Sequence, residues 1–298
     1  MPFARQPRFK RSTEVPSIRV TRRDREIIER VFEHRFLRST HLHSLLGGSR
    51  QQLLRRLQWL FHHGYLDRPR TQIDYYRSGS RAMVYGLGHR GAGLLEAELE
   101  IPHGKVEWTT KNRTVTRYFL EHTLAVADVM IALESACRRH DGVELVLYGD
   151  TRDEPLKWSV RVQHGGRTAE IGVVPDKVFG LRFANSPEIT WFFLEADRAT
   201  MPVHRHNLQQ TSFSRKLLAY HETWRRGLMK NRFPRFRVLT VTTSPERVED
   251  LIEANRALTQ GKGSGLFLFT DKITFASVAD ALTIPMLNGR GETVWIVG

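Results

Sequence analysis

The chain has 298 residues, of which 40% are hydrophobic, and a formal net charge of +14. This length accommodates two domains of ordinary size, each with its own core. No stretch approaches the roughly 18 consecutive apolar residues of a membrane-spanning helix, and the arginine-rich start lacks the apolar centre of a secretory signal. Cys137 is the single cysteine, which excludes an intramolecular disulfide and a cysteine zinc cluster. We therefore expect a soluble, cytoplasmic protein with no membrane partner.

The positive charge is concentrated in the amino-terminal third. The first 90 residues hold 19 Lys and Arg against 7 Asp and Glu, so they carry +12 of the total. Such a concentration of basic residues is the electrostatic signature of a nucleic-acid partner. Residues 1–20 are basic and contain no apolar run, which predicts a disordered arm that adds phosphate contacts. We expect the partner to be double-stranded DNA.

Three helices in close succession are predicted within residues 21–99. Thr21 is placed to cap the first helix, and the apolar residues after it recur at helical spacing. A second, short helix follows Ser39. The third helix is expected over Arg50–His63, after two turn-forming glycines, and ends at Gly64. This order predicts a helix-turn-helix.

Two short strands, 65–68 and 82–87, are expected to form a wing beside these helices, with a further helix over 92–98. The third helix would enter a DNA groove, with the direct-contact candidates Arg50, Gln51, Gln52, Arg55 and Arg56. The wing supplies the phosphate-contact candidates Arg68, Arg70, Arg77 and Arg81. The alternatives are a basic face that is merely solvated and a winged helix that contacts protein.

A second domain is expected after a linker at 100–113, where proline, glycine and polar residues break the periodic pattern. It would span 114–298. Its predicted helices lie at about 115–140, 205–226 and 245–259, and its predicted strands at 143–148, 158–162, 169–174, 177–183, 189–194, 236–241 and 266–269. The pair 169–174 and 177–183 is predicted to form a hairpin. This order indicates an α/β (α+β) domain in which helices pack against a mixed sheet.

Acidic motifs stand at the ends of two of these strands, as Pro175-Asp176 and Glu195-Ala196-Asp197. If the two strands are neighbours, Asp176 and Glu195 could bring carboxylates within reach of one divalent cation. In regular strand geometry Asp197 lies on the same face as Glu195. Three oxygen ligands at this edge could hold magnesium or manganese, whose bound water would attack a phosphodiester.

The order helix, three strands, helix, strand, with Pro-Asp followed 19 residues later by Glu, resembles the restriction-endonuclease-like core, known by its PD-(D/E)xK motif. By that resemblance Asp176 and Glu195 would be metal ligands, and Glu121 on the preceding helix could be an additional acid. The resemblance implies a nuclease-like domain with flanking helices, which makes magnesium or manganese the only candidate cofactor.

One departure from the nuclease motif puts the activity in doubt. Where the motif has a lysine, two residues beyond the glutamate, this chain has Asp197. The missing cation could come from Arg198 or from Lys216 on the next helix, or the site could be inactive. In a purely structural interpretation, Asp176 caps a turn, while Glu195 and Asp197 pair with Arg198, Arg205 or His204.

The whole arrangement also resembles the replication-relaxation family of mobile-element proteins, which are associated with plasmid replication and DNA relaxation. The resemblance is carried, over about 200 residues, by Thr21-Arg-Arg-Asp24, the helix from Ser49-Arg50 to Leu57, His63-Gly-Tyr-Leu66, Tyr85-Gly-Leu-Gly88, Gly91-Ala92, Glu121-His122, Pro175-Asp176, the stretch Phe193–Thr200, Lys216 and Tyr220. It implies a setting in plasmid or other mobile DNA more than a particular reaction.

Two functional hypotheses therefore stand. In the first, the protein is a DNA-binding accessory or regulatory factor in replication, mobilisation or relaxation, with a degenerate nuclease-like domain. In the second, it is a metal-dependent DNA endonuclease or nickase that the winged helix directs to its site. A homodimer is expected because winged helices commonly read paired half-sites, and other replication or mobilisation proteins are possible partners. The glycine-rich stretch Gly261–Gly265 lacks the spacing of a phosphate-binding P-loop and is expected to be a flexible turn.

Overall fold

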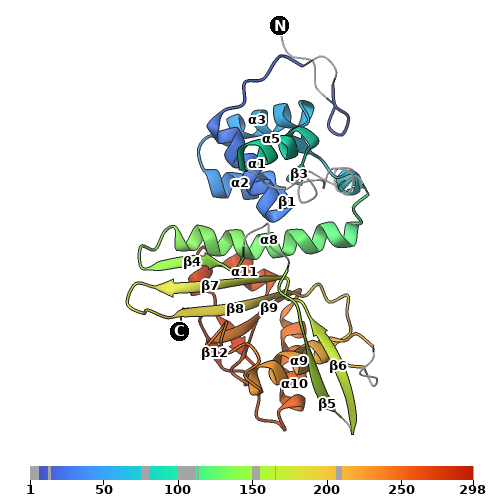
Figure 1. The fold of residues 1–298 in the computed structure, drawn as a ribbon, viewed down its shortest axis with the longest axis vertical. Coiled ribbons are helices and arrows are strands. Elements are labelled where there is room, and N and C mark those ends of the chain that lie inside the picture. The colour runs from blue at the N-terminus through green and yellow to red at the C-terminus, as the bar shows by residue number, and fades with distance from the viewer. Residues whose placement is uncertain are drawn as a thin grey trace. The chain divides into compact units, whose positions relative to one another are not determined.

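A computed structural model describes residues 7–12, 15–74, 81–99, 112, 114–149, 155–164, 166–205 and 210–297. The chain divides into two compact units, Met1–Ile131 and Ala132–Gly298 (Figure 1). The division falls within helix α8, Arg117–Cys137. Most of residues 100–113 lies outside the described part of the chain, so the linker there stays a prediction.

The first unit consists of helices around a small antiparallel sheet. Its strand β3 lies between β1 and β2. The elements are α1 (Arg22–His34), β1 (Phe36–Arg38), α2 (Ser39–Leu46), α3 (Arg50–His62), β2 (Leu66–Asp67), a 3-10 turn (Arg70–Gln72), β3 (Val84–Leu87) and α5 (His89–Leu99). The expected helices are present, and so are the two strands expected after them. Strand β1 was not predicted, because three residues are too few to show the alternation of a strand.

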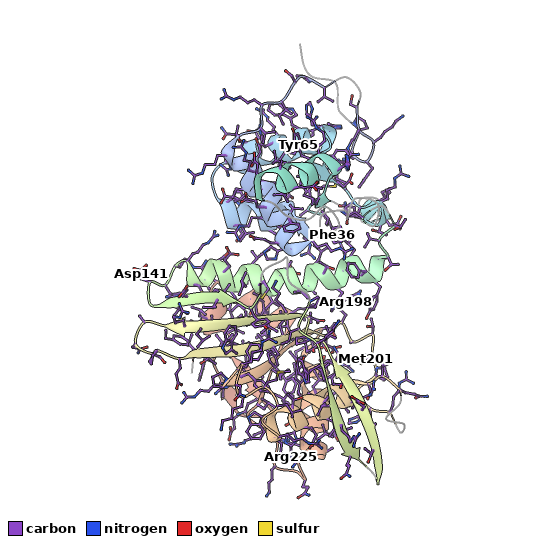
Figure 2. All side chains as sticks on the ribbon, viewed as in Figure 1. Phe36, Tyr65, Asp141, Arg198, Met201 and Arg225 are labelled. Atoms are coloured by element: carbon purple, nitrogen blue, oxygen red, sulfur yellow. The ribbon has the colours of Figure 1, made fainter. Side chains whose placement is uncertain are left out.

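Local capping signals account for the helices of the first unit. The Thr21 side chain accepts a hydrogen bond from the backbone of Asp24, and that of Ser49 accepts one from Gln52, so each satisfies a free N–H at a helix start. Gly64 has φ 81°, the left-handed conformation that ends a helix. Aliphatic and aromatic side chains of α1, α2 and α3 form one buried cluster, and Figure 2 labels Tyr65 among its members.

Asp24 ties α1 to α3. Its side chain is fully buried and accepts hydrogen bonds from the backbone N–H and hydroxyl of Thr21, both at 2.7 Å. Arg56 on α3 donates Nε to Oδ1 at 2.6 Å and Nη2 to Oδ2. Burial on its own raises the pKa of Asp24, but the hydrogen bonds from Arg56 and Thr21 outweigh it and lower that pKa. The buried charge is thus fully compensated.

The second unit is built on a seven-stranded mixed sheet in the order β12-β11-β10-β9-β8-β7-β4. Its central strands β8, β9 and β10 are parallel, and the outer pairs are antiparallel. The strands are β4 (Val143–Leu147), β7 (Lys177–Phe183), β8 (Ile189–Ala196), β9 (Phe236–Thr242), β10 (Phe267–Asp271), β11 (Met286–Asn288) and β12 (Thr293–Val294). The apolar run at 189–194 suits β8, because a parallel strand inside a sheet is buried on both faces. The observed helices and mixed sheet confirm the α+β class.

The predicted hairpin of 169–174 with 177–183 is wrong. Strand β6 (Arg167–Val173) pairs with β5 (Trp158–His164) in a separate two-stranded sheet, whereas β7 pairs with β4 and β8. Pro175 separates β6 from β7 and has no N–H to donate to a ladder. The next residue, Asp176, donates its backbone N–H to Leu194 on β8 at 3.0 Å, so the chain joins the large sheet there.

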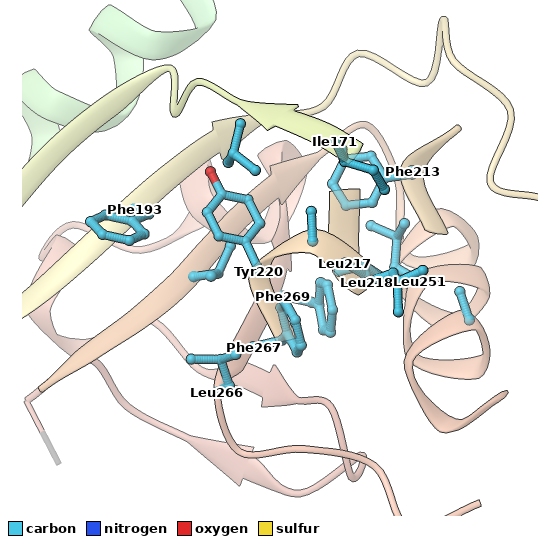
Figure 3. Packing of buried hydrophobic residues seen from close by; sticks show 14 of the residues in the cluster. Ile171, Phe193, Phe213, Leu217, Leu218, Tyr220, Leu251, Leu266, Phe267 and Phe269 are labelled. Carbon is cyan, nitrogen blue, oxygen red and sulfur yellow. The ribbon is translucent and has the colours of Figure 1, made fainter. Parts of the chain in front are cut away.

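Helices α9 (Phe213–Arg225) and α10 (Pro245–Leu258) pack against each other beside this sheet (Figure 1), and α11 (Lys272–Ser277) follows β10. Figure 3 shows buried side chains of α9 and α10 packed with phenylalanines of β8 and β10. Helix α9 begins later than the predicted residue 205, because Ser212 caps it by accepting a hydrogen bond from Arg215. Among the described residues, no helix has the length and apolarity needed to cross a membrane.

The contact between Asp24 and Arg56 predicts different outcomes for two adjacent arginines. Arg56→Ala leaves a buried carboxylate without its main partner and should lower the free energy of unfolding by about 2 kcal/mol. Arg55→Ala removes an exposed side chain and should leave stability unchanged within about 0.5 kcal/mol. Urea unfolding of both variants measures the difference, and equal stability of the two variants would contradict the role given to Asp24.

Candidate functional site

The solvent-facing side of α3 carries basic and amide side chains. Of the five predicted direct-contact residues, four are exposed, namely Arg50, Gln51, Gln52 and Arg55. Two large apolar side chains share this side, with Leu54 39% and Trp59 43% exposed. No acidic residue occurs anywhere in α3. We call Arg50, Gln51, Gln52 and Arg55 the α3 basic face.

Arg56 and Arg68 are held within the first unit. The Arg56 guanidinium is bound by Asp24, so Arg56 is not counted in the α3 basic face. Arg68 lies over the Phe61 ring, 4.1 Å from its centroid, and donates to the Tyr85 hydroxyl at 3.2 Å. Of the other predicted wing residues, Arg70 and Arg81 are exposed and Arg77 lies outside the described residues.

The predicted basic arm is described in part, and that part packs on the first unit. Arg11 donates to the backbone oxygen of Phe61 at 2.9 Å and forms an ion pair with Asp67 at 2.5 Å. The backbone N–H of Ser12 donates to His62 at 3.1 Å. These contacts order residues 11–12 against the helices.

A buried acid, Glu195, is the centre of a polar group in the second unit. It lies on β8 with 2% of its surface exposed. Lys216 on α9 donates Nζ to its Oε2 at 2.5 Å, and the Tyr220 hydroxyl donates to its Oε1 at 2.6 Å. Lys216 and Tyr220 lie four residues apart, so they share one face of the helix. In Figure 3 the Tyr220 ring stands among apolar side chains, with its hydroxyl pointing away from Phe267 and Phe269.

Asp176 lies beside Glu195, immediately before the neighbouring strand β7. The backbone N–H of Ala196 donates to Asp176 Oδ2 at 2.8 Å, and Asp176 returns a backbone bond to Leu194. The structure therefore brings together three of the predicted catalytic residues. We call Asp176, Glu195, Lys216 and Tyr220 the Glu195 cluster. Of the two cations considered for this site, Lys216 is the one that contacts the glutamate directly.

The Glu195 cluster shifts the proton affinities of its members. Burial raises the pKa of Glu195 to about 7, and the nearby Asp176 carboxylate adds to this increase, while Lys216 and Tyr220 oppose it. The pKa of Tyr220 is raised well above its usual value by burial and by the Glu195 carboxylate. Although burial opposes it, the carboxylates of Glu195 and Asp176 raise the pKa of Lys216. Glu195 therefore titrates close to neutrality.

Asp197 does not join Glu195. Its Oδ2 accepts hydrogen bonds from the Thr242 hydroxyl at 2.8 Å and from Arg247 Nε at 2.9 Å, and its Oδ1 accepts the backbone N–H of Ala199 at 3.1 Å. Strand β8 ends at Ala196, so strand alternation does not extend to Asp197. The Asp197 carboxylate still lies near enough to Lys216 to contribute to the raised pKa of that lysine. The basic partner of Asp197 is Arg247 on α10, and not Arg198, Arg205 or His204.

The residues of this edge do not fit a divalent cation as they are placed. Magnesium and manganese take several oxygen ligands with free lone pairs. Both oxygens of Glu195 are occupied by Lys216 and Tyr220, and one oxygen of Asp176 holds a backbone N–H. Within the part of the chain that the structure describes, no three His, Cys, Asp or Glu residues are grouped to hold a metal ion.

Glu121, the predicted additional acid, is on α8 in the first unit. It accepts a hydrogen bond from Arg117 Nε at 2.7 Å, one helical turn away. This is an ordinary ion pair at i, i+4 spacing. Glu121 belongs to the first unit, whereas the Glu195 cluster belongs to the second.

Three polar partners of the acidic residues were missed in the sequence, namely Tyr220, Thr242 and Arg247. Tyr220 could have been paired with Lys216 from its helical spacing, because both lie on the face that α9 turns towards β8. Thr242 and Arg247 reach Asp197 from the next strand and helix. No local signal identifies these two, since only the parallel pairing of β8 with β9 brings them near.

Comparison with known proteins agrees with this architecture. A model of the replication-relaxation family matches residues 29–238. The chain belongs to the replication-relaxation family. The match confirms the resemblance inferred from the sequence, and it includes α3 and the Glu195 cluster, whereas Thr242 and Arg247 lie beyond it. No curated protein and no solved structure matches the chain significantly. Family membership indicates a role in replication or relaxation.

The raised pKa of Glu195 predicts a pH-dependent stability. In the unfolded chain the carboxyl titrates near 4.5, and in the folded chain near 7. The folded state therefore binds the extra proton between these values, and stability falls as the pH rises from 4.5 to 7, by up to about 3 kcal/mol. Glu195→Gln should remove this part of the pH dependence.

Thermal unfolding between pH 4.5 and 8 measures the effect as the difference in stability between the wild type and the Glu195→Gln variant at each pH. The matched control is Glu249→Gln, which removes an exposed carboxylate from α10. A Glu195→Gln variant whose profile parallels the wild type would show that Glu195 is already ionised at pH 5.

Proposed function

We propose that this protein is a DNA-binding accessory factor in the replication, mobilisation or relaxation of a plasmid or other mobile element in the cytoplasm. The observation that carries the proposal is the α3 basic face. It is exposed, it contains no acidic residue, and it belongs to a segment with a net charge of +12. Arginine and glutamine are the side chains that read guanine and adenine edges in the major groove.

Two features of the first unit support a winged helix-turn-helix. Helices α2 and α3 are joined by Gly47 and Gly48, both at positive φ, and β2 and β3 pair after them. In this motif the second helix enters the major groove and the wing contacts the backbone. We assign α3 to the groove, and the exposed Arg70 and Arg81 to phosphate. A homodimer that reads paired half-sites, and partners among other replication or mobilisation proteins, belong to the same proposal.

We assign the second unit a nuclease-like scaffold in which the acidic residues are structural. Glu195 is satisfied by Lys216 and Tyr220, and Asp197 by Thr242 and Arg247. A cation that displaced the Tyr220 hydroxyl from Glu195 would leave a buried polar group unpaired. This cost favours an accessory role over cleavage.

A metal-dependent DNA endonuclease or nickase is the second candidate. One observation favours it: Lys216 contacts Glu195 beside Asp176, and so supplies the cation that the motif lacks at position 197. Titration of MnCl2 into the protein separates the two candidates. The nuclease predicts binding that Asp176→Ala abolishes and Glu249→Ala retains, whereas the accessory factor predicts the same heat for the wild type and both variants.

The DNA-binding assignment predicts that arginines on α3 and in the wing contribute differently. Arg55→Ala should weaken binding to the native locus about tenfold, because one base-edge contact is lost, and should affect random DNA much less. Arg81→Ala should weaken binding to both DNAs and reduce the salt dependence by about one unit of slope. Fluorescence anisotropy with labelled duplexes at several salt concentrations measures both effects.

Arg161→Ala is the matched control for these variants, because it removes an exposed arginine from β5 in the second unit. It should bind both duplexes like the wild type. If Arg55→Ala lost the same factor on native and random DNA, α3 would not be the helix that reads the sequence.

A further inference from the structure

A cavity of about 450 Å³ lies in the second unit, away from the Glu195 cluster. Its walls come from the last turn of α9, the start of β9, the loop after α10 and the turn after β11, and its lining includes His221, Trp224, Arg237, Lys262, Ser264 and Arg290. Arg237 is at the start of β9, whereas Thr242, which bonds Asp197, ends the same strand. The cavity and the acidic residues thus occupy opposite ends of β9.

The charge of this cavity is positive and uncompensated. Arg237, Lys262 and Arg290 line it, together with His221, and no carboxylate does. Over residues 210–297, which the structure describes without a gap, the side chains of these three cations make no ion pair. Three converging cations without an anion repel one another, so an anionic ligand would be bound favourably.

The loop that carries Lys262 is held in one conformation. Gly263 has φ +67°, and a Cβ there would lie 2.2 Å from the backbone oxygen of Gly289. Its N–H donates to the Thr259 hydroxyl at 2.8 Å, and the N–H of Ser264 donates to the buried Asn255 Oδ1 at 2.8 Å. Residues 261–265, expected to be a flexible turn, are therefore tied to the end of α10 and packed against the turn after β11.

Arg290 is anchored in the same way. Its backbone N–H donates to Asn288 Oδ1 at 2.9 Å, and its backbone oxygen accepts a hydrogen bond from Arg256 at 2.6 Å. The side chain of Arg290 stays exposed. The backbones of Lys262 and Arg290 are thus positioned before any ligand arrives, which reduces the entropy lost on binding.

The cavity also has an aromatic wall. Trp224 is 52% exposed, which is unusual for so large an apolar side chain. The His221 ring lies next to it, with the ring centroids 6.2 Å apart. Both belong to the last turn of α9, whose final residue, Arg225, is labelled in Figure 2. An exposed indole beside cations is the combination that stacks a nucleobase while the phosphate is neutralised.

We propose that this cavity binds a nucleotide, with its phosphate on Arg237, Lys262 and Arg290 and its base on Trp224. The nucleotide is either free or an unpaired member of a DNA strand, since the phosphate and base are common to both. The proposal goes beyond DNA binding by α3 and does not require cleavage at the Glu195 cluster. Lys262 and Arg290 lie outside the segment that matches the family.

The test measures binding of a fluorescently labelled dAMP to the full chain, and its displacement by competitors. A mononucleotide probe reports on the cavity even if α3 binds DNA. The wild type should bind the probe. Arg237→Gln and Lys262→Gln should each weaken binding about tenfold, because a charge-assisted contact to phosphate is lost. Trp224→Leu should weaken it at least about fivefold. Lys230→Gln, which removes an exposed cation outside the cavity, is the matched control and should bind like the wild type.

Three competitors separate the possible sources of the ligand. Displacement by unlabelled dAMP indicates a free nucleotide, and stronger displacement by a single-stranded decathymidylate indicates a DNA strand. Inorganic phosphate should compete much more weakly than either. The proposal is wrong if the probe does not bind, if Arg237→Gln and Lys262→Gln bind it like Lys230→Gln, or if phosphate competes as well as dAMP and Trp224→Leu has no effect. Thermal unfolding of each variant verifies that the fold is retained.

Discussion

Burial of the Glu195 carboxylate is the constraint around which the second unit is arranged. An unpaired carboxylate with 2% exposure would cost several kcal/mol. Lys216 and Tyr220 offset part of this cost, and both reach the carboxylate from one face of α9. Asp176 adds a second negative charge. It connects the start of β7 to the same strand, because its carboxylate accepts the N–H of Ala196 and its backbone N–H donates to Leu194. Strands β7 and β8 and helix α9 are therefore positioned by polar contacts as well as by the apolar core.

The first unit is also arranged around a buried carboxylate. Asp24 is as deeply buried as Glu195. Of the adjacent arginines Arg55 and Arg56, it binds Arg56. This contact sets the orientation of α3, because the side that holds Arg56 must face α1. The α3 basic face is then turned to solvent without any acidic neighbour on the helix. A buried carboxylate thus determines which arginines of α3 remain exposed, and these are the arginines that we propose contact DNA.

Sequence patterns predicted the structural features that depend on residues close together in the chain. Thr21, Ser49 and Gly64 mark helix ends by their own chemistry, and α1 and α3 begin and end close to the predicted positions. Strand β1 has three residues, which is too short for a pattern. The separation of β6 from β7 coincides with the bond between Asp176 and Leu194 on the next strand, which no local pattern around residue 175 indicates.

The candidate sites also contain residues that a local pattern identifies and residues that only the fold brings together. Asp176 and Glu195 could be predicted as neighbours, because both stand at strand ends. The partner of Asp197 could not, since Arg247 becomes a neighbour only when β9 and α10 are in place. The nucleotide cavity combines four elements whose sequence patterns are unrelated. Its lysine lies in a glycine-rich loop that has no recognised phosphate-binding spacing.

The account makes α3 the DNA-binding element and the Glu195 cluster a structural element of the scaffold. The most direct test incubates purified protein with supercoiled plasmid carrying its native locus, in magnesium, manganese or EDTA, beside the Asp176→Ala, Glu195→Ala double variant. The account predicts binding to the plasmid without nicking, in every condition and for both proteins. Metal-dependent nicking by the wild type that is lost in the double variant would contradict it and would establish a nuclease.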